Sequence, residues 1–365
     1  MKPQLSFLLL LVFIVIISCT EKYHFRDLGQ QTTIVITGLV TNEPGPYYVR
    51  VVENVSEIST GRITQRPIND ARVTIESNGS VDELRSFYTV PVDSVWSIWE
   101  RYLYFIDIPN GDGDYTRFQL EKSMWEDNKF HNDFREGAYF TTSTKGIPGH
   151  TYTLKVEYAG QEYLVTDYMC YGTVIDSMSV EPIGKYIIDK PDDTDGFMVP
   201  CLYFAEPQDE VNFYMFQVGA VTYRYEPNNR WNWVFDGFVP AKNLIINGWG
   251  GGGEDWYISV VSDRFMPPYV YQYKMSDGDH ARKYMQGTDI NFWPGWDNGG
   301  AIDMFCITEP VYRYYYALSR QYYEDGGAFS PSPASPPTNF TGGAQGCFSA
   351  ASVSQYDLDL RKEKD

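Results

Sequence analysis

Thr33-Ile34-Val35-Ile36-Thr37-Gly38-Leu39-Val40 decides the fold, because β-branched residues fill this stretch and a single glycine interrupts it. That composition is typical of a buried β-strand. The turn-forming run Asn42-Glu43-Pro44-Gly45-Pro46 comes next, and the sequence Tyr-Tyr-Val-Arg-Val-Val at 47–52 predicts a second strand. Two strands on either side of a Pro/Gly turn indicate antiparallel β-structure.

The following segments repeat this pattern of short strands separated by turns. Apolar side chains alternate toward one face in residues 67–75, and Asn78-Gly79 predicts a tight turn. Residues 152–158 and 163–166 add two strands around a turn at Ala159-Gly160. Short strands at this spacing predict an antiparallel β-sandwich.

The chain after its first 30 residues divides into two domains and a tail. We predict a β-sandwich domain at 31–170 that carries an insertion at 82–135, in which a hairpin reaches beyond the sandwich. A second β-rich domain follows at 171–357 and contains one C-terminal helix near 311–325, and a charged tail ends the chain at 358–365. The predicted fold class is thus mostly β.

One apolar face predicts the helix. Val311, Tyr315, Leu318 and Tyr322 recur at helical spacing after Pro310, and a glycine-containing stop follows them. We therefore expect this face to pack on the second domain.

The first 18 residues predict a lipoprotein signal peptide. Lys2 precedes an apolar run that is too short to span a bilayer, and Ser18 places a small residue directly before Cys19. The Cys19 thiol would receive a diacylglyceryl group before cleavage, and further acylation of the new N-terminus would give stable anchoring. We expect residues 19–30 to form a tether from the lipid. The alternative is an ordinary cleaved signal peptide with a cysteine near its end.

Composition excludes some classes of partner. The net charge of −19 argues against nucleic acid, whose phosphates would repel the chain. An acidic, solvated surface explains that charge. After Cys19, four cysteines remain in an oxidising compartment, and we favour the disulfides Cys170–Cys201 and Cys306–Cys347 because each would close a local loop. Reduced, buried thiols are the alternative.

Catalytic and metal signals are weak. The four histidines stand in no metal-binding or catalytic motif, so we expect no cofactor and no enzymatic activity. Asn110, Asp112, Asp114 and Glu121 partly match a calcium loop, but Tyr115 occupies the position where such a loop needs glycine. A solvated turn explains these residues better, so we predict no metal site.

Aromatic residues give the strongest signal for binding. The sequence has 30 tyrosines and nine tryptophans, residue types that suit protein interfaces and stacking on sugars. We select Trp249, Trp256, Trp293 and Trp296 as a ligand or partner surface, with the remaining aromatics mostly in the core. Tyr312, Tyr316 and Tyr323 lie off the buried helix face and are candidates for the same role.

The chain resembles a family of Bacteroidota lipoproteins, the domain-of-unknown-function family 4249, over nearly the whole mature sequence. The resemblance rests on the signal ending at Cys19, on residues 34–41, 67–75 and 149–154, and on the tyrosine-rich helix. It also rests on 339–348, where the frame Gly342-Gly343-x-x-Gly346 is kept although Phe340-Thr341 and Cys347 depart from the family pattern.

The resemblance implies an outer-membrane lipoprotein whose N-terminal sandwich is similar to carboxypeptidase regulatory domains. It implies a TonB-dependent outer-membrane channel as partner, and it carries over no catalytic residue. We therefore expect a non-enzymatic accessory or ligand-capture subunit, anchored in outer-membrane lipid through Cys19 and exposed at the cell surface. The periplasmic face is the alternative location. A stand-alone glycan- or peptide-binding module and, less favoured, a hydrolase with two carboxylates in one cleft are the alternative functions.

Overall fold

A computed structural model describes fifteen parts of the chain. They are residues 30–57, 62–89, 95–98, 103–109, 115–120, 136–182, 198–205, 207, 211–219, 221–226, 232–238, 259–262, 269–274, 299–323 and 336–359.

The described residues are mostly strand, and the mostly β prediction with one C-terminal helix is confirmed. The strands are β1 (Gln30–Thr41), β2 (Tyr48–Glu57), β3 (Arg62–Pro67), β4 (Arg72–Ser77), β5 (Ser80–Glu83), β6 (Arg85–Ser86), β7 (Val95–Ile98), β8 (Leu103–Pro109), β9 (Tyr115–Leu120), β10 (Ala138–Phe140), β11 (Thr151–Tyr158), β12 (Gln161–Tyr168), β13 (Ile175–Pro182), β14 (Met198–Ala205), β15 (Phe213–Gly219), β16 (Val221–Glu226), β17 (Asn232–Phe238), β18 (Ser259–Ser262), β19 (Tyr269–Lys274), β20 (Gly299–Ile307) and β21 (Gln345–Asp359). The helices are the short 3-10 turn η1 (Phe87–Thr89) and the α-helix α5 (Glu309–Tyr323).

A sandwich forms the N-terminal half, as the alternating strands predict. A four-stranded sheet in the order β12-β11-β4-β5 packs its apolar face toward β1, β2 and β21. Inward-facing Val73 and Ile75 of β4 and Leu154 and Val156 of β11 are almost fully buried. Thr74 and Lys155 between them are paired on the opposite face of the sheet, where Thr74 is also buried. Asn78 has a φ of 50°, as a two-residue hairpin turn requires, and this confirms the turn predicted there.

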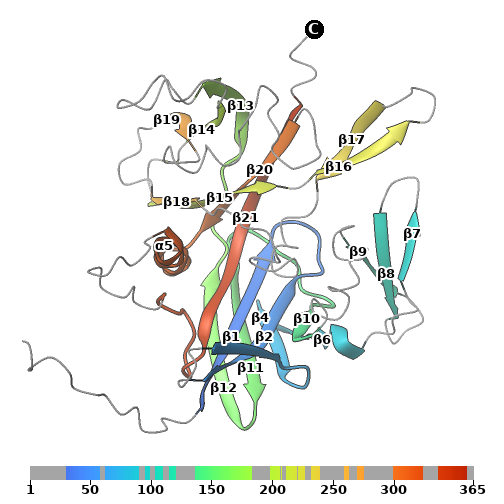
Figure 1. Cartoon of the computed structure of the whole chain (residues 1–365), viewed down its shortest axis with the longest axis vertical. Coiled ribbons are helices and arrows are strands. Elements are labelled where there is room, and N and C mark those ends of the chain that lie inside the picture. Colours follow the sequence, from blue (N-terminus) through green and yellow to red (C-terminus); the bar gives the residue numbers. More distant parts are fainter. Residues whose placement is uncertain are drawn as a thin grey trace, which may run out of the picture.

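Strand β21 connects this sandwich to the rest of the molecule, and in Figure 1 it runs through the middle of both halves. Its first residues, Gln345–Ala351, pair in parallel with β1, and from Ser352 onward it pairs antiparallel with β20. One nine-stranded sheet therefore contains strands from both predicted domains. The predicted boundary near residue 170 does not separate two sheets, because the end of the chain returns to pair with its first strand.

Gly346 permits this return. It has a φ of 101°, and a Cβ atom at this position would lie 2.0 Å from the carbonyl oxygen of Ile36 in β1. Only glycine allows the two backbones to approach so closely. The glycine frame of the family resemblance thus has a physical role in the pairing of β21 with β1.

Strands β15 and β20 separate two further cores. Phe213, Met215 and Phe305 face a core that also contains Val311 and Tyr315 of α5. The alternate residues Tyr214, Phe216 and Met304 face a second core, which also contains side chains of β13 and β14. Val311 and Tyr315 lie on the predicted apolar face of the helix and are buried, so the predicted orientation of α5 is confirmed for these two residues.

The predicted insertion at 82–135 begins too early. Asp82, Leu84 and Phe87 are almost completely buried, and β6 pairs with β10 at one end of the nine-stranded sheet. This segment is therefore part of the sandwich, because its apolar side chains complete the core. Beyond it, β7, β8 and β9 form a separate three-stranded sheet, drawn to the right in Figure 1.

Candidate functional site

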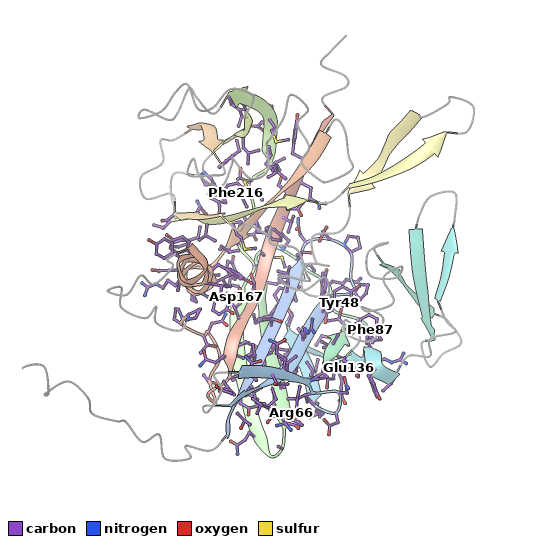
Figure 2. The ribbon with its side chains drawn as sticks, viewed as in Figure 1. Tyr48, Arg66, Phe87, Glu136, Asp167 and Phe216 are labelled. Atoms are coloured by element: carbon purple, nitrogen blue, oxygen red, sulfur yellow. The ribbon has the colours of Figure 1, made fainter. Side chains whose placement is uncertain are left out.

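A buried carboxylate lies where the sandwich, α5 and β21 meet. Asp167 of β12 is 5% exposed, and Figure 2 shows it beside α5 at the middle of the molecule. The Thr308 hydroxyl, directly before the helix, donates to Asp167 Oδ1 over 2.6 Å. The amide of Ala350 in β21 donates to Asp167 Oδ2 over 2.8 Å. One side chain therefore links three elements that are far apart in the sequence.

Burial dominates the electrostatics of this position. Desolvation raises the pKa of Asp167 to about 6, and the hydrogen bonds from Thr308 and Ala350 only partly oppose it. The pKa of the neighbouring Cys347 thiol is raised well above its usual value by burial and by the Asp167 charge. A thiol held protonated in this way is a poor nucleophile, so the cluster has a structural role.

The chain just after Asp167 presents apolar side chains to solvent. Tyr168 is 41% exposed, and Tyr171 and Val174 are each 67% exposed. Ile147, in the loop before β11, is 43% exposed, and that loop is hydrogen-bonded to the same segment from the Gly149 amide to the Met169 carbonyl. We call Ile147, Tyr168, Tyr171 and Val174 the junction surface.

The segment that carries Tyr171 and Val174 is hydrogen-bonded to β21 on both sides. Ser352 donates a short hydrogen bond to the carbonyl of Cys170, and the Ile175 amide donates to the Ser354 hydroxyl over 3.0 Å. A Cβ atom on Gly172 would lie 2.7 Å from Cβ of Ser352. Large apolar side chains fixed in an exposed position are typical of binding surfaces.

A second exposed aromatic surface lies on α5. Tyr316 is 43% exposed and its ring stacks on that of Tyr312, 5.7 Å away between centroids. The Tyr312 ring in turn packs on that of Phe213 in β15, with 5.0 Å between centroids. Val211, two residues before Phe213 in the chain, is 55% exposed. We call Val211, Tyr312 and Tyr316 the helix surface.

A shallow cavity of about 300 Å³ adjoins the start of the same helix. It is lined by Glu309, Pro310, Arg313, Pro337 and Thr338. The Arg313 guanidinium donates to Glu309 Oε1 over 2.7 Å, and this pairs the two charged groups that line the cavity. The helix therefore offers aromatic rings and an arginine side by side, a combination that is enriched at protein interfaces.

Comparison with known proteins identifies the family. The model of the family described as Domain of unknown function (DUF4249) matches residues 21–357. The chain belongs to the DUF4249 family. No curated protein matches it.

Most of the residues selected from this DUF4249 sequence lie outside the described residues. These are the anchor Cys19, the surface candidates Trp249, Trp256, Trp293 and Trp296, and the calcium-loop candidates Asn110, Asp112, Asp114 and Glu121. Within the ranges that the structure describes, no group of three or more His, Cys, Asp or Glu side chains could hold a metal ion. Nor does any helix in those ranges have the length and apolar character to cross a membrane.

The predicted disulfides of this DUF4249 chain are wrong in the structure. Neither Cys306 nor Cys347 forms a disulfide, and both are buried. Cys306 of β20 is opposite Ser352 of β21, and Cys347 lies five residues before Ser352 in the same strand. At about 3.3 Å per residue, the two cysteines are therefore about 16 Å apart along β21. A disulfide requires Cα atoms closer than about 7 Å. Cys347 is instead part of the core that contains Tyr315.

Cys170 also forms no disulfide in the structure, so the predicted bond to Cys201 is not found. Cys201 lies opposite Ser179 in β14, well beyond Cys170 along the chain. The loop-closure argument failed because the register of β13 and β14 places Cys201 opposite Ser179, whereas the residue of β13 nearest to Cys170, Ile175, is opposite Phe204.

Sequence reasoning missed Asp167 and the junction surface. The alternation of β12 could have indicated Asp167, because a carboxylate there occupies an inward position between Val165 and Met169. Nothing in the sequence indicated that Tyr171 would be exposed, because its exposure depends on the return of β21.

Proposed function

We propose that this protein is a lipid-anchored accessory subunit of the outer membrane in Bacteroidota, which docks on a TonB-dependent channel and captures a nutrient for it. The observation that carries the proposal is the N-terminal pattern, in which an apolar run is followed by Ser18 and Cys19. Family membership supports it, because the resemblance implies this place and this partner. Acyl chains on Cys19 would keep the β-rich body next to an integral channel.

The helix surface is the part of the molecule that we assign to the channel. Tyrosine and arginine supply much of the binding energy in protein interfaces, because both bury large areas and still form hydrogen bonds. Tyr316 and Arg313 are exposed on consecutive turns of α5, and Tyr312 and Phe213 support the Tyr316 ring from below. A rigid aromatic base reduces the entropy that docking would lose.

The anchor is tested in the native host with the wild-type chain and Cys19→Ser. We expect mass spectrometry to find an acylated cysteine at the mature N-terminus of the wild type, and the protein to fractionate with the outer membrane. The variant has no thiol for the lipid and should lose both properties. An unmodified wild-type N-terminus would contradict the anchor.

Docking is tested by affinity purification of the full chain from membranes in a mild detergent. We expect a TonB-dependent channel to co-purify with the wild type, and Tyr316→Ala to reduce its recovery about tenfold, as expected for an interface hot spot. Tyr88→Ala is the matched control, because Tyr88 is 58% exposed and lies on η1, in a different element. Absence of the channel from the wild-type preparation would refute docking, and equal recovery with Tyr316→Ala would refute the assignment to α5.

A further inference from the structure

We propose that the outer face of the β12-β11-β4-β5 sheet, at the end that carries the junction surface, binds a neutral oligosaccharide. The proposal extends the capture role above by naming the class of cargo. It rests on that role only for what happens to the sugar after binding, because binding itself can be measured without a channel.

Tyr171 supplies a fixed aromatic platform. Tyr171 is 67% exposed, and the hydroxyl end of its ring lies against Gly149. A Cβ atom at Gly149 would lie 2.4 Å from the Tyr171 hydroxyl oxygen and 2.8 Å from Cζ, so any other residue here would displace the ring from its present position. Contact at the hydroxyl end limits the positions that the ring can take, and its exposed area can stack on an apolar face of a pyranose.

The backbone around Tyr171 keeps the platform in place. The Gly149 amide donates to the Met169 carbonyl over 2.8 Å, and the Met169 amide donates to the His150 carbonyl over 2.9 Å. Tyr168 lies opposite Thr151 on the outer face of the sheet, so a second aromatic side chain extends the surface in the direction of the strands.

Neutral polar groups continue from the aromatic end. Thr153 and Thr166 are opposite each other, with their hydroxyl oxygens 3.0 Å apart. Thr151 is exposed in the next row on the same face, where it is opposite Tyr168. The Asn78 amide nitrogen lies 2.9 Å from Nδ1 of His150, at the hairpin beside this row. Hydroxyl and amide groups both donate and accept, which matches the hydroxyl groups of a sugar.

The distribution of charge favours a neutral sugar over an acidic one. The ion pairs of this sheet lie at its other end, in a ladder formed by Glu83, Arg72, Glu157, Lys155 and Glu162. Glu76 is opposite Thr153 and faces the same side. Its carboxylate would accept hydrogen bonds from sugar hydroxyls but would repel a uronic acid.

The test is calorimetric titration of the full-length chain in a polyoxyethylene detergent, which carries no sugar headgroup. The probes are maltohexaose, cellohexaose, xylohexaose and mannohexaose, with hexagalacturonate as the acidic comparator. We expect at least one neutral hexasaccharide to bind and hexagalacturonate to bind more weakly. Tyr171→Ala should weaken binding about tenfold, whereas Tyr171→Phe should retain it because the stacking ring is kept.

Tyr88→Ala is the control for an exposed tyrosine outside the site and should bind as the wild type does. Urea unfolding of each variant checks that the fold is intact. The proposal is overturned if no neutral probe binds, if hexagalacturonate binds most tightly, or if a folded Tyr171→Ala variant binds as well as the wild type. None of these results would affect channel docking, which Tyr316→Ala tests separately.

Discussion

Asp82 and Asp167 are both 5% exposed, yet the protein treats these two carboxylates in opposite ways. Desolvation raises the pKa of Asp82, but the hydrogen bonds that it accepts outweigh this effect and lower the pKa below its usual value. For Asp167 desolvation prevails, and the pKa rises to about 6. Burial alone therefore does not decide the ionisation of a carboxylate in this fold.

The difference lies in the number of donors that face each group. Asp82 accepts five hydrogen bonds of 2.7 to 3.0 Å from Thr142, Ser143 and Thr144, three from amides and two from hydroxyls. These donors hold the loop after β10 on the sandwich. Asp167 accepts from fewer donors, the Thr308 hydroxyl and the amides of Ala350 and Tyr168. The Asp82 region thus depends on a charged side chain, whereas β21 holds the Asp167 region together through its backbone.

The two groups have opposite links between pH and stability. Because the pKa of Asp82 is lowered on folding, its contribution is complete above the unfolded pKa of about 3.9 and is lost as the pH falls further. Because the pKa of Asp167 is raised to about 6, its contribution is complete below about pH 3.9 and is lost as the pH rises toward 6. A fall in pH should therefore destabilise the region around Asp82 and stabilise the region around Asp167.

The largest effect should come from Asp82→Ala. Removal of the carboxylate leaves the amides of Thr142, Ser143 and Thr144 without their acceptor, and we expect a loss of about 3–5 kcal/mol in the free energy of unfolding at pH 7. Urea denaturation measures it. Asp82→Asn is the control and should lose less, because its side-chain oxygen still accepts. A loss below about 1 kcal/mol in the free energy of unfolding of Asp82→Ala would show that these amides form hydrogen bonds with water instead.

Gly346→Ala should come next, because it breaks the backbone contact on which the Asp167 region depends. The new Cβ would meet the Ile36 carbonyl, so we expect a loss of about 3 kcal/mol from clash and positive φ together. Gly343→Ala is a close control. Gly343 has a φ of 86°, but no atom lies within 4 Å of the point where its Cβ would be, and only about 1 kcal/mol of strain is expected. Equal losses in urea unfolding would mean that the approach of β21 to β1 contributes nothing.

The sequence predicted what depends on local periodicity. The inward positions of Val73 and Ile75, the turn at Asn78-Gly79 and the apolar face of the helix at Val311 and Tyr315 each depend on a few neighbouring residues. Each is found in the structure. The glycine frame at 342–346 could also be recognised in the sequence, but its role in the pairing of β21 with β1 could not be predicted. Its partner Ile36 lies about 310 positions earlier in the chain, and local patterns carry no information about such a pairing.

The failures share the same cause. The cysteine pairs were chosen because they are near in sequence, but β21 changes partner at residue 352 and separates Cys347 from Cys306. The raised pKa of Asp167 and the exposure of Tyr171 also arise where β21 meets the end of β12. Properties that depend on a non-local strand could not be obtained from the residues beside them.

Asp167→Asn tests the other side of the comparison and should have a smaller effect that depends on pH. The amide keeps an acceptor for Ala350 and a donor for Thr308 but never ionises, so it resembles the protonated acid. We expect the stability of the variant relative to the wild type to rise by about 2 kcal/mol between pH 4 and pH 7, at 1.4 kcal/mol per pKa unit and allowing for relaxation. Urea titrations across this range measure it. Parallel pH profiles for the two proteins would show that Asp167 titrates normally.

The smallest effect should come from Arg72→Ala, which asks whether a lowered pKa is enough to stabilise the fold. The pKa of Glu157 is lowered by hydrogen bonds from Lys155 and from Arg72, just as donors lower that of Asp82. The Arg72 and Glu157 side chains, however, are 56% and 36% exposed, and water replaces a lost partner there. We expect no measurable change in the urea midpoint for Arg72→Ala, with or without 1 M salt. A loss comparable to that of Asp82→Ala would mean that hydrogen-bonded charge stabilises this sheet whether or not it is buried, and the contrast between Asp82 and Asp167 would then need another explanation.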